Sequence, residues 1–128
     1  MRPEAAHFRV LVVDDEKIIA DTVALIVRSR GFDARVAYDA EEALNVATGF
    51  PPDALISDVM MPGMNGVELS RHIMARHPDC RVLLISGNPA AAAALFDVTP
   101  DGKGLAVLAK PVHPSEILSF LAAPITVE

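Results

Sequence analysis

The sequence predicts an α/β domain built on a doubly wound parallel sheet with helices on both faces. Short apolar runs alternate along the chain with segments of helical periodicity, a pattern typical of parallel sheets joined by helices. The chain has 128 residues, 52% of them hydrophobic, which suits one domain with one core. Disorder is not expected at this hydrophobic content.

Apolar runs predict the first three strands of the sheet. These runs are Phe8–Val13, the weaker Phe32–Ala37, and Ala54–Ser57. The segment Lys17–Arg30 predicts the first helix, because apolar residues recur on one helical face and Gly31 is a stop signal. That face carries Ile19, Val23, Ile26 and Val27. A second helix is expected over Ala40–Thr48, because Asp39 and Glu42 have the spacing of a capping box.

The second half of the chain continues the alternation. Asn65 is expected to cap a helix that runs to about His77, where Pro78 follows. Two further strands are predicted at Arg81–Ile85 and Leu105–Leu108. The last helix should begin at Pro114, a residue favoured in the first helical turn, and end near Ala122. Between the last two strands, the prolines and glycines of Asn88–Gly104 predict a short or irregular helix.

Polar residues follow four of the five predicted strands. Right-handed crossovers place the carboxyl ends of parallel strands at one edge of the sheet, where open α/β sheets bind ligands. The first strand ends in Asp14 and Asp15, the third in Asp58, the fourth in Ser86 and the fifth in Lys110. The sequence therefore predicts a site at this edge, built from residues that are distant along the chain.

The chemistry of this set indicates a cation and a phosphoryl group. Two carboxylates about 4 Å apart repel by roughly 4 kcal/mol at an effective dielectric constant near 20. Such acids either share a proton or bind a cation, and an all-oxygen donor set suits a hard ion such as Mg²⁺. Lys110 can neutralise a phosphate oxygen and Ser86 can donate a hydrogen bond to another.

Four short motifs resemble those of the receiver domains of two-component response regulators, the CheY-like family. The motifs are VVDDE at 12–16, SDVMMPGMNG at 57–66, ISG at 85–87 and KP at 110–111. The resemblance spans essentially the whole chain. It implies the flavodoxin-like strand order 2-1-3-4-5 and a cis peptide bond between Lys110 and Pro111.

The resemblance also implies roles for the residues of the metal site. Asp58 corresponds to the phosphoacceptor. Asp15 and Asp58 correspond to carboxylates that bind Mg²⁺ directly, and Asp14 to a carboxylate that holds a metal-bound water. The backbone carbonyl of Met60 corresponds to a further metal ligand.

Ser86 and Lys110 correspond to the groups that contact the phosphoryl oxygens. By this resemblance the chain is a phosphorelay protein, not an enzyme with a separate substrate, and it assists its own phosphorylation and dephosphorylation. Its phosphoryl donor would be a sensor histidine kinase or a histidine phosphotransfer protein. Phosphorylation would alter the binding of an output protein whose identity the sequence does not give.

Three other functions agree less well with the sequence. A Mg²⁺-dependent phosphatase of the haloacid-dehalogenase type needs D-x-D after its first strand, whereas Asp14–Glu16 reads D-D-E. A flavin-binding module would need aromatic residues, but the chain has one Tyr and no Trp. A receiver-like docking module that never takes phosphate is opposed by the complete acidic set, although Val107 stands where the family usually carries an aromatic residue.

Composition argues against several partners and compartments. The formal net charge is −6 without a basic cluster, so direct binding to nucleic acid is not expected. No apolar stretch approaches the ~20 residues of a membrane span, and the start does not resemble a secretory leader. Cys80 is the only cysteine, which favours a reducing, cytoplasmic setting. Residues 1–128 are expected to form a single receiver domain without an effector domain.

Overall fold

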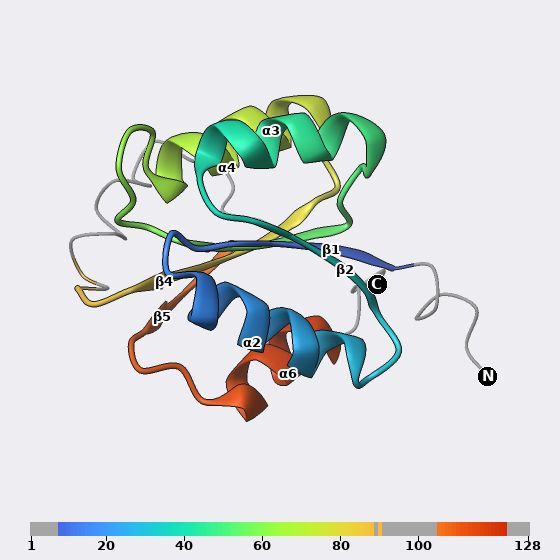
Figure 1. Ribbon diagram of the computed structural model, residues 1–128, viewed down its shortest axis with the longest axis vertical. Coiled ribbons are helices and arrows are strands. Elements are labelled where there is room, and N and C mark those ends of the chain that lie inside the picture. Colours follow the sequence, from blue (N-terminus) through green and yellow to red (C-terminus); the bar gives the residue numbers. More distant parts are fainter. Residues whose placement is uncertain (1–7, 89, 91–104, 123–128) are drawn as a thin grey trace.

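The computed structural model describes residues 8–88, 90 and 105–122, and its strands form one parallel sheet (Figure 1). The strands are β1 (Arg9–Val13), β2 (Asp33–Ala37), β3 (Ala54–Asp58), β4 (Arg81–Ser86) and β5 (Leu105–Ala109). Their order across the sheet is β2-β1-β3-β4-β5, and all four pairings are parallel. The predicted fold class and the predicted strand order 2-1-3-4-5 are therefore confirmed.

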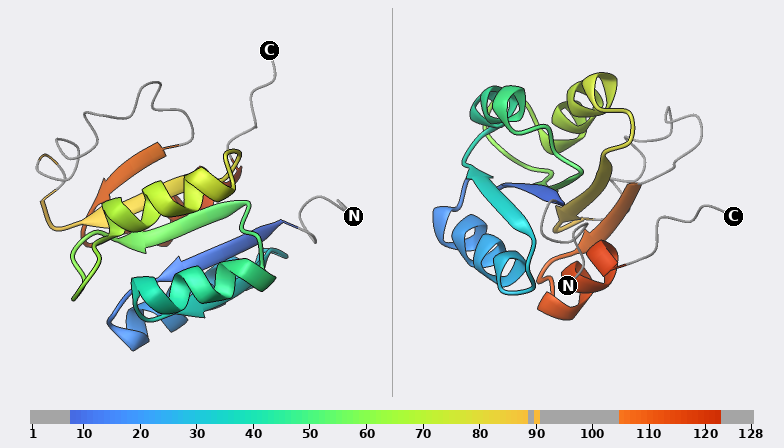
Figure 2. Two further views of the ribbon diagram at one scale, coloured as in Figure 1. Left: turned by 90° about the horizontal axis from the view of Figure 1, so that it is seen from above. Right: turned by 90° about the vertical axis from the view of Figure 1, so that its right-hand side faces the viewer.

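Helices cover both faces of this sheet. They are α2 (Lys17–Arg28), α3 (Ala40–Gly49), α4 (Gly66–Arg76) and α6 (Pro114–Ala122). Helices α3 and α4 lie on one face, while α2 and α6 lie on the other (Figure 2). The segment Asn88–Gly104, for which an irregular helix was predicted, lies outside the described residues except for Asn88 and Ala90.

Each face of the sheet has its own hydrophobic cluster, because side chains alternate along a strand. In β1, Leu11 and Val13 pack toward α3 and α4, whereas Val10 and Val12 pack toward α2 and α6. These four side chains are almost completely buried. Burial on both faces explains why the strands appear in the sequence as continuous apolar runs. Full burial of each such side chain contributes about 1.5–3 kcal/mol to stability.

Side-chain caps fix the starts of α3 and α4. The Asp39 carboxylate accepts the N–H of Glu42 at 2.7 Å, which confirms the predicted capping role of Asp39. The Glu42 carboxylate accepts the N–H of Tyr38 at 2.8 Å instead of the N–H of Asp39. At α4 the capping box is complete: the Asn65 side chain accepts the N–H of Glu68, and the Glu68 carboxylate accepts the N–H of Asn65.

Helix α2 is shorter than predicted and is rotated about its axis relative to the expected apolar face. It ends at Arg28 instead of Arg30, and Gly31 adopts a φ of +92°, which glycine tolerates without strain. Its buried residues are Ala20, Val23, Ala24 and Val27. Two alanines on the buried face let the helix lie close to the sheet. The larger Ile19 and Ile26 are displaced to its flank, where Ile19 is 38% exposed.

Within the described part of the chain, every helix is too short or too polar to cross a lipid bilayer.

Candidate functional site

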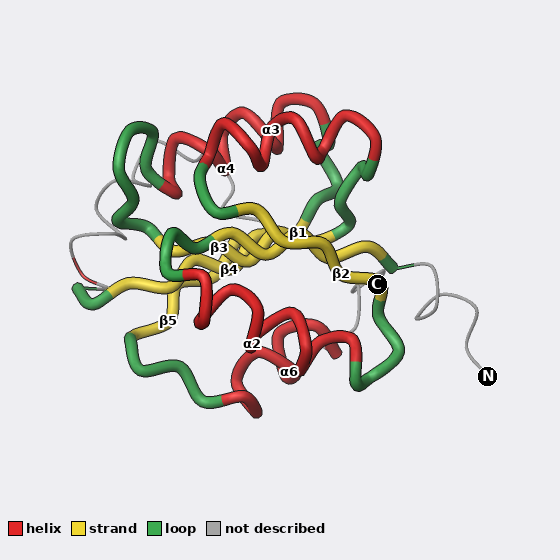
Figure 3. Tube along the Cα trace, viewed as in Figure 1, coloured by secondary structure: helices red, strands yellow, loops and turns green. Residues whose placement is uncertain are grey.

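The loops that follow β1 and β3 leave the sheet at the same edge, on the left in Figure 3. Strand register places the predicted site residues beside one another at this edge. Asp58 is the last residue of β3 and pairs with Ile85 of β4, while Ser86 pairs with Ala109 of β5. The N–H of Lys110 then donates to the carbonyl of Ser86 at 2.9 Å. The parallel topology thus brings strand ends from across the sequence to one place.

Three carboxylates meet at this edge as predicted. Oxygen atoms of Asp14, Asp15 and Asp58 lie within 4.8 Å of one another. Asp14 and Asp58 are 3% and 4% exposed, whereas Asp15 is exposed. Burial of two carboxylates beside a third raises the free energy of their charged forms. A bound divalent cation would lower this free energy. The donor set contains only oxygen, and it fits Mg²⁺ or Ca²⁺ better than a metal that prefers nitrogen or sulfur.

Asp14 is the acid most affected by this environment. Burial raises its pKa from 3.8 to about 6, and the negative charges of Asp58 and Asp15 act in the same direction. The N–H of Glu16, which donates to Asp14 Oδ1 at 2.9 Å, opposes the shift. Near neutral pH the Asp14 carboxylate is therefore ionised, although its surroundings favour the neutral carboxylic acid.

Lys110 supplies the compensating positive charge. Its Nζ lies 3.1 Å from Asp58 Oδ1. Burial by itself would lower the pKa of Lys110, but the hydrogen bond and charge of Asp58 outweigh it, together with the charges of Asp14 and Glu16, and raise this pKa. The ammonium is therefore held in its charged form beside Asp58. The Lys110–Pro111 peptide bond is cis, which confirms that prediction.

Ser86 is 3% exposed, and its hydroxyl oxygen accepts the N–H of Asn88 at 2.9 Å. A hydroxyl that accepts one hydrogen bond keeps its own O–H to donate. The Met60 side chain, two residues after Asp58, is 73% exposed. The metal-binding role of the Met60 carbonyl stays a prediction.

Two residues contact the backbone carbonyl of Asp58, and neither contact was predicted from the sequence. The buried Ser57 hydroxyl donates to the backbone carbonyl of Asp58 at 2.9 Å. A Cβ added to Gly66 would lie 2.2 Å from the same carbonyl oxygen, so only glycine fits where the loop returns to the strand. The Gly66 N–H also donates to the Val59 carbonyl at 2.8 Å. The sequence signal that could have identified Ser57 is its position as a polar residue within the apolar run that ends at Asp58.

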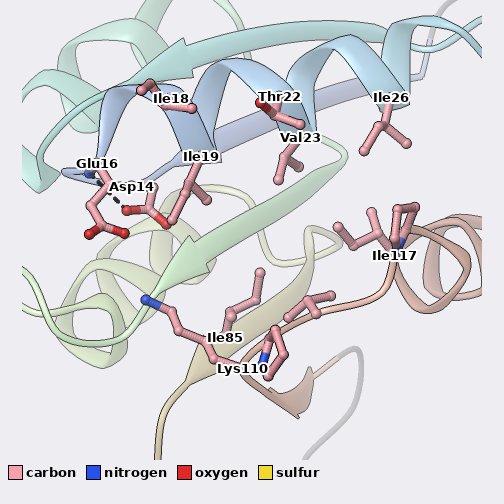
Figure 4. Close-up of a pocket in the computed structure, with 13 residues that line it drawn as sticks. Asp14, Glu16, Ile18, Ile19, Thr22, Val23, Ile26, Ile85, Lys110 and Ile117 are labelled. Atoms are coloured by element: carbon pink, nitrogen blue, oxygen red, sulfur yellow. Dashed lines mark hydrogen bonds between the residues drawn. The ribbon is translucent and has the colours of Figure 1, made fainter.

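The site opens into a groove of about 600 Å³ between α2 and the segment from Lys110 into α6 (Figure 4). Asp14, Glu16 and Lys110 lie at one end of this groove. Apolar side chains of α2 line its length, and Ile117 of α6 lies opposite Ile26. The charged end of the groove is thus part of the site, while the remainder is an apolar surface.

Cys80, the lone cysteine, has no part in this site. It lies at the start of β4, at the opposite edge of the sheet, and is buried. Burial raises the pKa of its thiol to about 12, with a further contribution from the charge of Asp53. A buried thiol with a raised pKa is expected to be unreactive.

Comparison with known proteins shows the family of the chain. The family model of the response regulator receiver domain matches residues 10–122. The probable transcriptional regulatory protein TcrX of Mycobacterium tuberculosis is 30% identical over 122 residues, which are 95% of this chain and 51% of that protein. The chain therefore spans about half the length of this relative.

Solved structures agree with the fold. A CheY-like receiver domain protein from Methanospirillum hungatei superimposes with a TM-score of 0.79 at 24% identity, over 89% of this chain and 90% of that one. A response regulator from Burkholderia pseudomallei, with a phosphorylated aspartic acid, calcium ion and citrate, superimposes with a TM-score of 0.77 at 28% identity, over 91% of this chain and 67% of that one. The chain belongs to the response regulator receiver domain family of two-component systems.

Proposed function

We propose that the chain accepts a phosphoryl group on Asp58 from a phosphohistidine of a sensor histidine kinase or a histidine phosphotransfer protein. The observation that carries this proposal is the position of Asp58. It is buried at the end of a central strand, 3.1 Å from the Lys110 ammonium, and its carboxylate clusters with those of Asp14 and Asp15. Such a carboxylate is fixed in direction by the sheet and by the Ser57 hydrogen bond to its carbonyl.

In the proposed reaction an Asp58 carboxylate oxygen forms a bond to phosphorus while the P–N bond of phosphohistidine breaks. The leaving imidazole nitrogen keeps the electron pair of that bond, and the product is an acyl phosphate. Lys110 offsets negative charge on the phosphoryl oxygens, and the Ser86 O–H donates to one of them. Their contribution is positioning and electrostatic stabilisation, which dominate catalysis of phosphoryl transfer. Water later cleaves the acyl phosphate.

We propose Mg²⁺ as the resident metal, held by Asp15 and Asp58 directly, by Asp14 through water, and by the Met60 carbonyl. When bound, the ion neutralises charge on the acids and on the phosphoryl group. The all-oxygen donor set supports this assignment. So does the Burkholderia pseudomallei relative, whose structure has a phosphorylated aspartic acid and a calcium ion.

The proposal describes a signalling domain that assists its own phosphorylation and dephosphorylation and thereby changes the binding of an output protein. Transcriptional regulation, which the name of TcrX gives to that protein, is not assigned to this chain, which spans about half of it. The net charge of −6 supports the view that these residues do not bind nucleic acid directly. A lone, buried cysteine is compatible with a reducing, cytoplasmic setting.

Intact mass spectrometry after incubation with a phosphoramidate donor and Mg²⁺ tests the proposal. Wild-type protein should gain one phosphoryl group, whereas Asp58→Asn should gain none and a chelator should suppress the reaction. Lys110→Met should slow the reaction while leaving the fold intact, because Lys110 is at the partly exposed rim of the site. Absence of an adduct on wild-type protein, or an adduct on Asp58→Asn, would contradict the proposal. Steady hydrolysis of p-nitrophenyl phosphate would instead favour a phosphatase.

A further inference from the structure

Ser57 places a hydroxyl in the hydrophobic interior, directly before Asp58 in β3. The first three residues of that strand are apolar, and Ser57 itself is 0% exposed. Side chains alternate along a strand, so Ser57 is on the same face as Leu55, which packs toward α3 and α4. Its partners in register, Val13 and Leu84, belong to the same hydrophobic cluster. A hydroxyl buried among such residues costs free energy unless it is hydrogen-bonded, so an apolar residue here would serve the fold as well.

The hydrogen bond that this hydroxyl makes connects no two elements of the fold. Ser57 donates to the carbonyl of the next residue, Asp58, at 2.9 Å. A bond between neighbours along the chain closes no loop. What it fixes is the orientation of the planar peptide group between Asp58 and Val59. Rotation of that group changes the backbone angle ψ of Asp58, which links the direction of the Asp58 side chain to the path of the chain after it.

Main-chain groups hold the same stretch from other sides. The N–H of Val59 donates to the carbonyl of Ile85 in β4 at 2.9 Å, and the carbonyl of Val59 accepts the N–H of Gly66 at 2.8 Å. Gly66 also lies against the Asp58 carbonyl, because a Cβ on it would be 2.2 Å from that oxygen. The next carbonyl along the chain is that of Met60, the proposed metal ligand. The Ser57 bond comes from a side chain, so a substitution can remove it and leave the main-chain bonds in place.

We propose that Ser57 is a positioning residue for phosphoryl transfer. Its hydroxyl holds the peptide group after Asp58 in the orientation that directs the Asp58 carboxylate and the Met60 carbonyl toward the metal. Ser57 acts through these groups and contacts neither metal nor donor, because it is completely buried. The inference rests on the proposed function, in which Asp58 is the phosphoacceptor and Mg²⁺ the resident metal. Phosphoryl transfer is sensitive to such positioning, because alignment of the reacting atoms supplies much of the rate.

Alanine substitution tests this role, with a second buried serine as the matched control. Ser70 in α4 is also 0% exposed, and its hydroxyl donates to the Val67 carbonyl at 2.7 Å. Ser57→Ala should slow phosphorylation by a phosphoramidate with Mg²⁺ by about two- to tenfold, the effect of one hydrogen bond. Ser70→Ala should react at the wild-type rate. Circular dichroism verifies that both variants are folded.

Threonine and valine at position 57 separate the hydroxyl from the packing. The two side chains have nearly the same shape, and each adds a methyl group where Ser57 has no exposed surface, so strain from overpacking is common to both. Ser57→Thr keeps the hydroxyl and should be phosphorylated about two- to tenfold faster than Ser57→Val. Equal rates for these two variants would overturn the proposal.

Magnesium affinity tests the role of Ser57 without any phosphoryl group. The Kd for Mg²⁺, measured by isothermal titration calorimetry, should be about two- to tenfold higher for Ser57→Ala than for Ser70→Ala. A purely structural role would lower the Tm of the metal-free protein and leave this Kd unchanged. The ¹³C resonance of the Asp58 carbonyl reports the hydrogen bond itself. It should shift in metal-free Ser57→Ala and stay in place in Ser70→Ala.

The outcomes distinguish this inference from the proposed function. If wild-type protein takes up no phosphoryl group, the proposed function is wrong, and the Kd for Mg²⁺ still decides whether Ser57 positions the metal ligands. If wild-type protein is phosphorylated and Ser57→Ala equals it in both rate and Kd, the proposed function stands and the role of Ser57 is refuted.

Discussion

At the scale of single residues, the ionised Asp14 side chain lowers the stability of the folded protein. A carboxyl whose pKa is raised on folding contributes stability that is fully present below its unfolded pKa of 3.8 and lost as the pH rises through its folded pKa of about 6. Near neutral pH, the ionised Asp14 therefore destabilises the metal-free protein. The Glu16 N–H compensates only partly. Such a cost is expected where a charge serves a ligand and not the fold.

Asp14→Asn should consequently stabilise the metal-free protein. The amide oxygen of Asn can still accept the Glu16 N–H, but no charge is buried. A difference of about two pKa units corresponds to at most about 3 kcal/mol in the free energy of unfolding at pH 7.5, and to about 1 kcal/mol at pH 4.5. Urea unfolding at the two pH values, in the presence of a chelator, measures this change. The explanation is wrong if wild type is the more stable protein at pH 7.5.

Met60 is expected to influence how water reaches the proposed acyl phosphate on Asp58. Its 73% exposed side chain follows Asp58 by two residues and offers no group that could orient a water molecule. Met60→Asn adds an amide at this position, so the acyl phosphate should decay severalfold faster than in wild type. Met60→Leu, which stays apolar at similar volume, should leave the lifetime unchanged. Following the adduct by intact mass over time distinguishes these variants, and equal lifetimes for all three would refute the role of Met60.

At the scale of secondary-structure elements, the turn between β3 and α4 is built around the peptide that carries Asp58. Gly63 turns the chain with a φ of +77°, and Gly66 returns to contact the Asp58 carbonyl. Asn65 then caps α4 immediately before Gly66. The turn therefore holds Asp58, the proposed phosphoacceptor, and begins the next helix with the same few residues.

Gly66→Ala should damage both the fold and the site. Its new Cβ would lie 2.2 Å from the Asp58 carbonyl oxygen and 3.0 Å from two further backbone atoms, so the backbone must move. Overpacking of this kind destabilises a protein by about 1–3 kcal/mol, and here the displaced atoms belong to Asp58, the proposed phosphoacceptor, and to Val59. Urea unfolding and the rate of phosphorylation should both change.

Gly49→Ala is the matched control for Gly66→Ala. A Cβ at Gly49, the last residue of α3, would meet nothing within 4 Å, so this variant should be neutral or more stable by up to about 1 kcal/mol. Equal stability of the two variants would show that the added Cβ at position 66 does not destabilise the fold through this contact.

The elements also show where prediction from sequence succeeded and where it did not. The existence of all described helices and strands followed from periodicity and from capping signals such as Asn65 with Glu68. The buried face of α2 did not follow, because hydrophobicity alone favours burial of Ile19 over Ala20. Whether Ile19 or Ala20 is buried depends on the distance between the helix and the sheet. The sequence pattern of a single helix does not determine that distance.

At the scale of the whole molecule, the site was predictable because it depends on topology more than on local detail. A parallel sheet with right-handed crossovers sends every strand end to one edge, so Asp14, Asp15, Asp58, Ser86 and Lys110 could be placed together before any distance was known. The contacts of Ser57 and Gly66 with the Asp58 carbonyl could not be predicted. The first depends on the orientation of a side chain within β3, and the second on the path of the loop before α4.

The same topology predicts that a metal ion stabilises the whole fold. Two of the three acids, Asp14 and Asp15, directly follow β1, and Asp58 ends β3, so an ion bound by the folded protein alone would link the ends of these two central strands. Binding adds RT ln(1 + [Mg²⁺]/Kd) to the free energy of unfolding, about 1.4 kcal/mol at tenfold Kd and about 2.7 kcal/mol at one hundredfold. Thermal unfolding at increasing MgCl₂, with NaCl added to equal ionic strength in the control, should therefore show a rising Tm.

The stabilisation should depend on the acids and on pH. Asp15→Asn and Asp58→Asn should remove most of the Mg²⁺-dependent rise in Tm, while Asp79→Asn, an exposed acid at the opposite edge of the sheet, should retain it. Because Asp14 must be ionised to help hold the ion and has a pKa of about 6, the rise should be larger at pH 7.5 than at pH 5. A rise of equal size in Asp58→Asn would mean that Mg²⁺ acts elsewhere on the acidic surface, and the assignment of the metal to this edge would then be wrong.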